Sequence, residues 1–211
     1  PEENGPDLDY SASSISIDLG FRDILVAGQK SGVVYGLDPD DGEILWSNAL
    51  SGGGTQGGVH FGMASEGKTV YVPLHDMEQT NDGKIYEDLK PGVHSVNAKT
   101  GELLWSKINP NNCGDIKFCD PGVSAALTAI PGAVIAGHQD GKIRIYDKKD
   151  GKILWSFNAL REFESVSGVP ASGGGFSGPG SAIRNGFMAM NSGYGIYYHM
   201  PGNALLLFSV E

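Results

Sequence analysis

Short apolar runs alternate with polar, glycine-rich segments along this chain, and the apolar runs have the length and composition of β-strands. Residues 33–37 and 143–146 are rich in β-branched and aromatic side chains, which favour strands. Each run is followed by a polar turn segment and then by a run with two aliphatic residues and a tryptophan. Two strands joined by a tight turn form a hairpin, so the pattern predicts β-hairpins.

The turn of each hairpin has the same chemistry. Its first residue is Asp or Asn, whose side chain hydrogen-bonds the backbone ahead of it, and its last residue is Gly, which adopts positive φ at little cost. The opening residues are Asp38, Asn97 and Asp147, and the closing glycines are Gly42, Gly101 and Gly151.

The hairpin is repeated three times. The repeats are residues 32–47, 92–106 and 141–156, and they align with one another. All three tryptophans of the chain, Trp46, Trp105 and Trp155, occupy the same repeat position. Their spacings of 59 and 50 residues match the period of a β-propeller blade. We expect each ring to pack between neighbouring sheets.

Two further strand candidates precede each hairpin, so each repeat contains four strands. These candidates are 14–18 and 23–28, 59–64 and 69–74, and 123–129 and 133–137. Beyond the third tryptophan, three more strands are expected at 181–184, 187–191 and 204–210, after a loop at 164–180. Residues 1–211 are therefore predicted to be one all-β, partial β-propeller domain with antiparallel four-stranded blades. The blades are placed at about 11–50, 57–110 and 121–160, with an incomplete fourth at 176–211.

Composition and charge narrow the function. The 32 glycines and 11 prolines argue against a helical bundle. A net charge of −10 with no basic run disfavours nucleic acid and anionic lipid as partners. The longest clean apolar run, 204–208, is too short to span a membrane. The chain begins at Pro1 without a signal-like segment, so we interpret it as a processed product or a fragment.

The chain contains two cysteines and five histidines, the residue types that form disulfides and metal sites. Cys113 and Cys119 lie six residues apart in a loop of Gly, Asn and Asp residues, which favours a local disulfide and an oxidising compartment. Two free thiols are the alternative, and a zinc site has little support without a second Cys pair or a spaced His pair. The five histidines show no metal-ligand spacing within one element and are expected to be isolated polar positions. They are His60, His75, His94, His138 and His199.

The repeat Asp-x-x-x-Gly-x-x-Leu-Trp resembles the tryptophan-docking repeat of the quinoprotein alcohol dehydrogenases. These are eight-bladed propellers that hold pyrroloquinoline quinone (PQQ) and Ca²⁺ on their axis. The linking stretches resemble the polyvinyl-alcohol dehydrogenase branch in particular, at residues 5–10, 26–35, 57–64, 70–73, 125–132, 191–195 and 200–203. The resemblance covers nearly the whole chain and implies the C-terminal half of an eight-bladed ring.

The resemblance also implies site residues. Asp9 matches the general base that takes the alcohol proton and lies at the Ca²⁺, with Asp7 as the second match. Lys30 matches the basic residue at the quinone carbonyls, and His75 or Asp76 stands where the family has an Asn that bonds the cofactor. A carboxylate can accept a proton as the substrate carbon is oxidised, and a cation stabilises charge on the quinone oxygens. From residue types alone, Asp9 could instead cap a loop and Lys30 could be a solvated strand-end lysine.

Two functions follow from these observations. The first is part of a PQQ-dependent dehydrogenase that oxidises a secondary alcohol or polyol, small or polymeric, and passes electrons to a cytochrome or a quinone. The second is a non-catalytic, secreted propeller that serves as a binding or structural module. Either form is expected in the periplasm or outside the cell. Open flanks of a partial ring call for another propeller segment, either the missing N-terminal half or a second copy of the chain.

Overall fold

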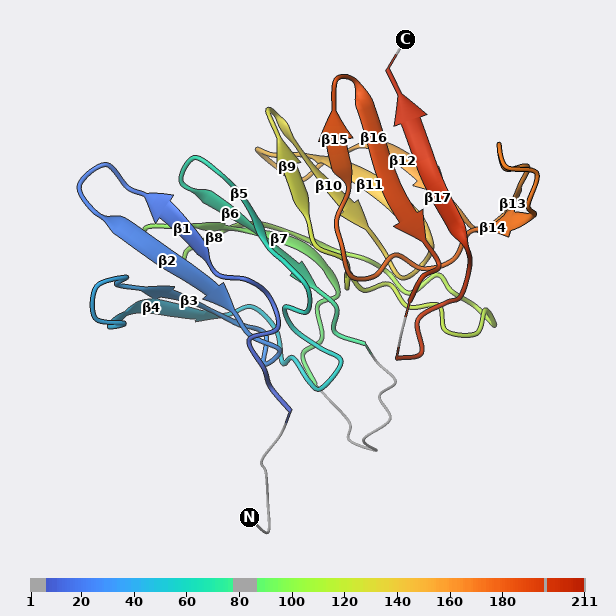
Figure 1. Ribbon diagram of the computed structural model, residues 1–211. Helices are drawn as coiled ribbons and strands as arrows, with labels where there is room; N and C mark the ends of the chain where they lie inside the picture. The colour runs from blue at the N-terminus through green and yellow to red at the C-terminus, as the bar shows by residue number, and fades with distance from the viewer. Residues whose placement is uncertain (1–6, 78–86, 196, 211) are drawn as a thin grey trace.

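The computed structural model describes residues 7–77, 87–195 and 197–210 (Figure 1). Over these residues the chain forms seventeen β-strands and no helix. Neighbouring strands within each sheet are antiparallel. The all-β fold expected from the hairpin repeats is therefore confirmed.

Three sheets contain four strands each, in chain order, as expected of propeller blades. The first contains β1 (Ile15–Asp18), β2 (Asp23–Gly28), β3 (Val33–Leu37) and β4 (Ile44–Ala49). The second contains β5 (Ala64–Glu66), β6 (Thr69–Leu74), β7 (Gly92–Asn97) and β8 (Leu103–Ile108). The third contains β9 (Thr128–Ile130), β10 (Ala133–Gly137), β11 (Lys142–Asp147) and β12 (Ile153–Asn158). The sheets follow one another across the molecule without closing into a ring (Figure 1).

The fourth sheet has three strands, β15 (Ala182–Arg184), β16 (Phe187–Ser192) and β17 (Ala204–Ser209). A short ribbon formed by β13 (Glu162–Phe163) and β14 (Ala171–Ser172) precedes it. Since β14 lies within residues 164–180, the expectation of an uninterrupted loop there is wrong. The ribbon is secured at its base by a hydrogen bond from Gly173 N to Arg161 O (3.1 Å).

The first strands of the second and third sheets are shorter than predicted. β5 and β9 begin five residues later than the runs 59–64 and 123–129. Val59 and Val123 are nevertheless fully buried, because they fill the space where adjacent sheets converge. A Cβ added to Gly28 would come within 2.8 Å of the Val59 side chain, so the two segments are in direct contact. These runs are apolar because of packing between sheets rather than strand pairing.

The predicted turn chemistry is present in each complete sheet. In the first, Asp38 Oδ1 accepts a hydrogen bond from Asp40 N (2.9 Å), and Gly42 N donates to Asp38 O (2.9 Å). Gly42 has a φ of 79°. The equivalent residues of the second and third sheets, Asn97 with Gly101 and Asp147 with Gly151, make the same two kinds of contact.

Two tryptophans dock onto the turn of the following sheet. The ring nitrogen of Trp46 donates to Ala98 O (3.0 Å), and that of Trp105 donates to Lys148 O (2.9 Å). A Cβ on Gly101 would lie 2.4 Å from Cε3 of Trp46, so glycine is required for this close approach as well as for its φ of 72°. The expectation that these rings pack between sheets is confirmed for both.

Trp155 occupies the equivalent position of the third sheet with a different environment. Its ring contacts Phe157 and Phe208, with centroids 6.0 and 5.6 Å away, and the residue remains 38% exposed. It lines an open apolar groove of about 490 Å³ together with residues of the third and fourth sheets, including Ile145 and Val210. Trp155 is therefore covered on one side only.

The hydrophobic core is divided into three clusters, one at each junction between neighbouring sheets. The middle strands supply both faces. Val70 and Val72 of β6 join the first cluster, whereas Tyr71 joins the second. Alternate residues of a strand point to opposite faces, so a strand buried on both faces must be apolar throughout.

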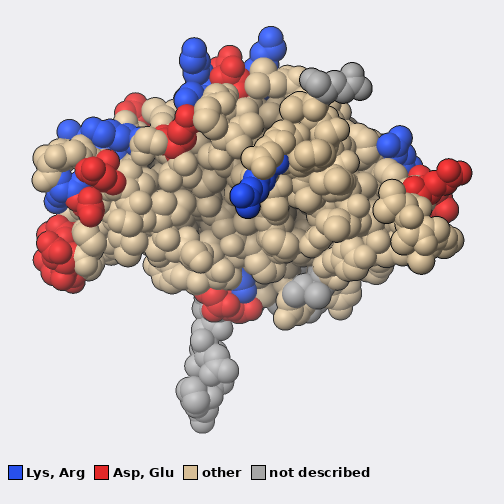
Figure 2. Space-filling view, turned by 45° about the horizontal axis from the view of Figure 1, so that its top comes forward, with Lys and Arg blue, Asp and Glu red and all other residues tan. Residues whose placement is uncertain are grey.

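The surface carries mixed charges. On the face in Figure 2, charged side chains stand mostly around the margin, with basic and acidic groups interspersed. That face thus presents no concentrated positive charge for a phosphate backbone. In the part of the chain that is described, no helix is long and apolar enough to cross a membrane.

Candidate functional site

Three of the predicted site residues, Lys30, His75 and Asp76, follow the second strands of the first two sheets. β2 ends at Gly28 and Lys30 comes two positions later, while β6 ends at Leu74 and Asp76 comes two positions later. Because successive sheets repeat the same path, these positions come to the same end of the molecule. That end is the lower one in Figure 1, where the N-terminal segment approaches β2.

Lys30 joins the two predicted carboxylates. Its Nζ lies 3.2 Å from Asp7 Oδ1 and 3.2 Å from Asp9 Oδ2. The lysine side chain is only 8% exposed, whereas those of Asp7 and Asp9 are 55% and 64% exposed. The hydrogen bond from Lys30 holds the pKa of Asp9 below its usual value, and neighbouring Asp7 contributes in the same direction. Asp9 is therefore an ionised carboxylate at neutral pH.

Two contacts hold the N-terminal segment that carries Asp7 and Asp9 in place. Lys30 N donates to Asp9 O (3.0 Å), which ties the segment to the turn after β2. The ring of Tyr10 packs on Tyr35 of β3 at 6.0 Å between centroids.

The glycine-rich connection between β4 and β5, residues 50–63, contacts the main chain of Lys30. Gly54 N donates to Lys30 O (2.9 Å), and a Cβ on Gly58 would come within 2.3 Å of the same oxygen. Gly58 has a φ of 56°, so its conformation and its lack of a side chain both serve this approach.

The side chain of Asp76 bonds to backbone N–H groups. Its two carboxylate oxygens accept hydrogen bonds from Gly58 N (2.7 Å) and Lys90 N (2.8 Å), and the residue is fully buried. Asp76 adopts a φ of 43°, which is uncommon outside glycine. It therefore links the connection over Lys30 to the segment that leads into β7.

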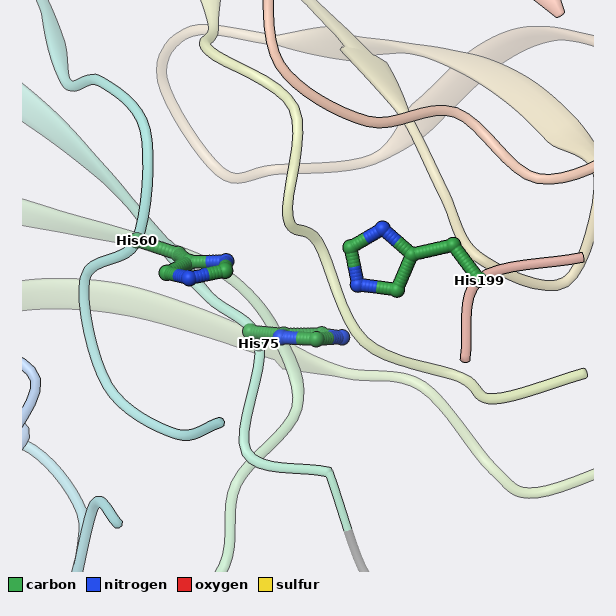
Figure 3. A group of neighbouring side chains, drawn as sticks. All are labelled: His60, His75 and His199. Carbon is green, nitrogen blue, oxygen red and sulfur yellow. The ribbon is translucent and has the colours of Figure 1, made fainter. Parts of the chain in front are cut away.

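Three histidines that were expected to be isolated lie together. His60, His75 and His199 each offer a ring nitrogen, and these three atoms lie within 4.8 Å of one another. Figure 3 shows the rings of His60 and His75 stacked, with the ring of His199 turned edge-on towards them. All three residues are buried. The expectation failed because the cluster is assembled from connections far apart in the sequence.

Burial governs the protonation of this cluster. Desolvation lowers the pKa of His60 and of His199 to about 4 and that of His75 well below its usual value. The proximity of His199 lowers the pKa values of His60 and His75 further. At neutral pH the three rings are neutral and can act as ligands through a ring nitrogen.

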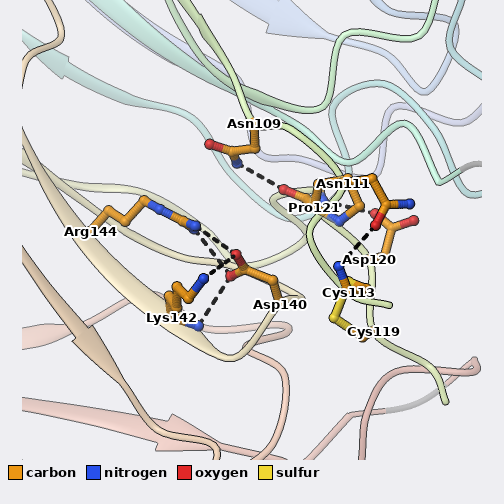
Figure 4. The surroundings of a disulfide bond; sticks show 10 residues. Asn109, Asn111, Cys113, Cys119, Asp120, Pro121, Asp140, Lys142 and Arg144 are labelled. Atoms are coloured by element: carbon orange, nitrogen blue, oxygen red, sulfur yellow. Dashed lines mark hydrogen bonds and ion pairs between the residues drawn. A yellow bond between two sulfur atoms is a disulfide. The ribbon is translucent and has the colours of Figure 1, made fainter. Parts of the chain in front are cut away.

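The predicted disulfide is confirmed. Cys113 and Cys119 are bonded, with an S–S distance of 2.03 Å, in the connection between the second and third sheets (Figure 4). Asn111 Oδ1 accepts a hydrogen bond from Cys113 N (3.1 Å) at the start of the loop. Asn109 Nδ2 donates to Pro121 O (2.8 Å), which brings the two ends of the connection together.

Lys30, Asp7 and Asp9 together have the chemistry expected on one side of a cofactor site. Asp7 and Asp9 are adjacent, half-exposed carboxylates, and Ca²⁺ takes oxygen ligands of this kind, six to eight in number. They supply part of such a set. The buried ammonium of Lys30 is a fixed cation of the type that stabilises negative charge on a quinone oxygen. The described residues thus fit one side of a Ca²⁺ and quinone site.

The family model PQQ_2, described as "Outer membrane protein assembly factor BamB", matches residues 13–175. The chain belongs to this family. The matched residues include all three aligned hairpins and their tryptophans.

Two curated relatives match over the full length of the chain. Identity is 40% over 228 residues to a polyvinylalcohol dehydrogenase of Pseudomonas sp., and 33% over 230 residues to one of Sphingopyxis sp. strain 113P3. In both cases the match covers 100% of this chain and 34% of the relative. The resemblance to the polyvinyl-alcohol dehydrogenases is therefore confirmed, and the chain spans about a third of the length of these relatives.

A solved structure agrees on the fold. The quinohemoprotein alcohol dehydrogenase ADHIIG from Pseudomonas putida HK5 superposes with a TM-score of 0.60 at 18% identity, covering 89% of this chain and 29% of that protein. The four-stranded sheets of this chain therefore have the arrangement of consecutive propeller blades.

Proposed function

We propose that the chain is a segment of a PQQ-dependent dehydrogenase that oxidises secondary alcohols or polyols, including polymeric ones. The observation that carries this proposal is the contact of Lys30 with Asp7 and Asp9, each at 3.2 Å. The resemblance to the quinoprotein alcohol dehydrogenases implies these three residues, and they form one cluster at the end of the molecule where the second strands finish.

Asp9 has the role of general base. Its carboxylate is ionised at neutral pH because Lys30 stabilises the charged form, and its exposed position leaves it open to a substrate hydroxyl. An alcohol that becomes a ketone must lose its hydroxyl proton, and Asp9 accepts it. Asp7 shares the ammonium of Lys30 and helps to hold Asp9 in position.

Lys30 has the role of cofactor contact. PQQ, when bound, supplies the two-electron acceptor, and Ca²⁺ beside it adds positive charge. Lys30 offers a fixed positive charge because its side chain is buried and bonded on two sides. Asp9 and Asp7 are the residues that would hold the Ca²⁺ on this side of the site.

The second predicted cofactor contact falls at His75 or Asp76. Both oxygens of Asp76 already accept backbone hydrogen bonds. His75 has no hydrogen-bond partner on either ring nitrogen among the described residues. We therefore assign the contact to His75 and a supporting role to Asp76, which holds the connection over Lys30.

Replacement of Asp9 tests the assignment. In the complete protein that contains this segment, supplied with PQQ and Ca²⁺, Asp9→Asn should lower the rate of secondary-alcohol oxidation by about 10²- to 10⁴-fold, the usual contribution of a general base. The rate is measured with an artificial electron acceptor, on a small secondary alcohol and on polyvinyl alcohol. PQQ binding, followed by its near-ultraviolet absorbance, should be retained.

Two further variants complete the test. Asp115→Asn changes an exposed carboxylate in the disulfide loop and should leave the rate unchanged. Lys30→Met should weaken PQQ binding as well as turnover. If Asp9→Asn and Asp115→Asn turn over equally fast, Asp9 is not the base.

A non-catalytic propeller is the second candidate. It is favoured by the internal hydrogen bonds of Asp76, because His75 or Asp76 stands where the family has an Asn that bonds the cofactor. This candidate predicts no PQQ binding at any concentration of Ca²⁺, whereas the dehydrogenase predicts saturable binding.

We further propose that the protein works in the periplasm or outside the cell, in keeping with the disulfide. The partly covered Trp155 and the apolar groove beside it support a partner that is another propeller segment. We favour the N-terminal half of the same protein over a second copy, because the curated relatives are about three times as long as this chain.

A further inference from the structure

We propose that His60, His75 and His199 form a binding site for a transition-metal dication that prefers imidazole ligands, with Zn²⁺ as the reference ion. This goes beyond the proposed dehydrogenase function, whose expected Ca²⁺ takes oxygen ligands. The site is built from three separate connections, before β5, after β6 and before β17 (Figure 3).

The ligand set has the composition of an open zinc site. One nitrogen from each ring lies within 4.8 Å of the other two. Three histidines with a fourth position left for water or another ligand are a common arrangement for Zn²⁺. Zn–N bonds of about 2.0–2.1 Å require nitrogens closer than this, so the side chains rotate towards one another when the ion binds.

The hydrogen bonding of the five histidines separates this cluster from the others. His94 bonds Lys90 O (2.9 Å) and Ser106 Oγ (2.9 Å), so both of its ring nitrogens have partners. His138 likewise bonds Asn109 and Tyr146. These two rings are satisfied by the protein itself.

The hydrogen bonding of the ring nitrogens in the His60, His75 and His199 cluster is incomplete. Both ring nitrogens of His75, which is fully buried, and Nε2 of His199 have no hydrogen-bond partner within the described ranges 7–77, 87–195 and 197–210. A buried polar atom without a partner is costly. A metal ion at the centre of the cluster relieves this cost, because it takes the lone pairs that the protein does not use.

Two serines provide the outer contacts that a metal site needs. The Oγ of Ser124 lies 2.9 Å from Nδ1 of His60, and the Oγ of Ser177 lies 2.8 Å from Nδ1 of His199. When Nδ1–H donates to the hydroxyl, the Nε2 lone pair is left for the ion, and the ring orientation is fixed. Coordination of His75 through one nitrogen leaves its other nitrogen as an N–H donor, which is compatible with a cofactor contact.

The positive charge beside the cluster is balanced by carboxylates. The ammonium of Lys30 acts on His60 from the neighbouring turn. Its own partners, Asp7 and Asp9, offset that positive charge.

Titration of the chelator-treated protein with ZnCl₂ by isothermal calorimetry tests the site. One ion should bind per chain. His75→Gln and His199→Gln should each weaken binding at least 10-fold. His94→Gln is the matched control, because it removes an equally buried ring outside the cluster, and its affinity should equal that of the unaltered protein.

A second measurement does not depend on how the variants fold. Nitrogen-15 NMR of the unaltered protein should show that ZnCl₂ moves the ring-nitrogen signals of three histidines and leaves those of two unchanged. The proposal is overturned if the unaltered protein binds no Zn²⁺, if binding persists in both His75→Gln and His199→Gln, or if His94→Gln weakens binding as much as they do.

Discussion

Buried histidines in this chain contribute to stability in a way that depends on pH. His138 is fully buried between Asn109 and Tyr146. Desolvation, aided by the nearby Arg144 guanidinium, lowers its pKa to about 3. Its pKa in the unfolded chain is about 6.5, so unfolding at mildly acidic pH takes up a proton.

The sign of this effect makes a prediction. A depressed folded pKa gives stability that is complete above about pH 6.5 and is lost as the pH falls towards 3. For His138 alone the loss is about 1.4 kcal/mol for each pH unit within this window. The free energy of unfolding, measured in urea by tryptophan fluorescence, should fall less steeply between pH 6 and pH 5 in His138→Gln than in the unaltered protein. Equal slopes would contradict the assignment.

The candidate site residues differ in how well the sequence reveals them. Asp9 and Lys30 were found because each stands in a family-specific stretch of the chain, and they are in contact in the structure. The histidine cluster was not found because His60, His75 and His199 come from three connections and share no local spacing. The structural role of Asp76 was also missed, since a carboxylate that caps two distant backbone amides looks like any other Asp in sequence.

At the scale of elements, the hairpin turn is the most informative unit of the chain. One glycine serves two purposes in it, a left-handed backbone and a close contact with a tryptophan of the preceding sheet. Gly101 does both, whereas Gly42 has a φ of 79° and nothing within 4 Å of its would-be Cβ. The two positions therefore separate backbone strain from ring contact.

Alanine substitution at these two glycines should have unequal effects. Gly42→Ala should cost about 1–2 kcal/mol of unfolding free energy, from backbone strain alone. Gly101→Ala adds displacement of the Trp46 ring, and overpacking of this kind costs about a further 1–3 kcal/mol. Urea unfolding measures both values, and equal losses would show that the Trp46 contact contributes nothing.

The disulfide is expected to stabilise one connection. Replacing Cys113 and Cys119 by serine should lower the unfolding free energy by about 2–3 kcal/mol in the chain-entropy account of a short loop. Proteolysis of the double variant should occur first within residues 111–120, while the sheets stay intact by circular dichroism. Cleavage that begins elsewhere would contradict a local role.

The elements also show the limits of apolar pattern as a guide. The hairpins were predicted closely because alternation, turn residues and tryptophans all agree there. The runs 59–64 and 123–129 were assigned to strands from apolar content alone, and most of each run is connection. Val59 is apolar because it packs on Gly28 of the preceding sheet, a contact that no local pattern shows.

At the scale of the whole molecule, stability is distributed over junctions between successive sheets. Each of the three core clusters belongs to one junction. The fourth sheet buries one face against the third, while Leu205 and Leu207 of β17 remain 69% and 67% exposed. Exposed apolar side chains on a strand at the edge of a sheet favour association with another chain.

Association should therefore depend on β17. Light scattering of the purified 211-residue chain should give a mass above 22.2 kDa in the absence of other chains. Leu205→Glu combined with Leu207→Glu should reduce association, because the added charges disfavour burial of this strand. Ile116→Glu, at an exposed position of the disulfide loop, is the control and should leave the mass unchanged. A stable monomer of the unaltered chain would contradict this expectation.

The direction of tryptophan docking has a consequence for biosynthesis. Trp46 bonds a carbonyl 52 residues further along the chain, and Trp105 bonds one 43 residues further along. On the ribosome, the first and second sheets therefore emerge with their tryptophans uncovered, and each is completed only when the next hairpin has been translated. A translational pause at this stage would leave one indole ring exposed to solvent. A chaperone that binds exposed aromatic side chains would then bind the nascent chain at that point.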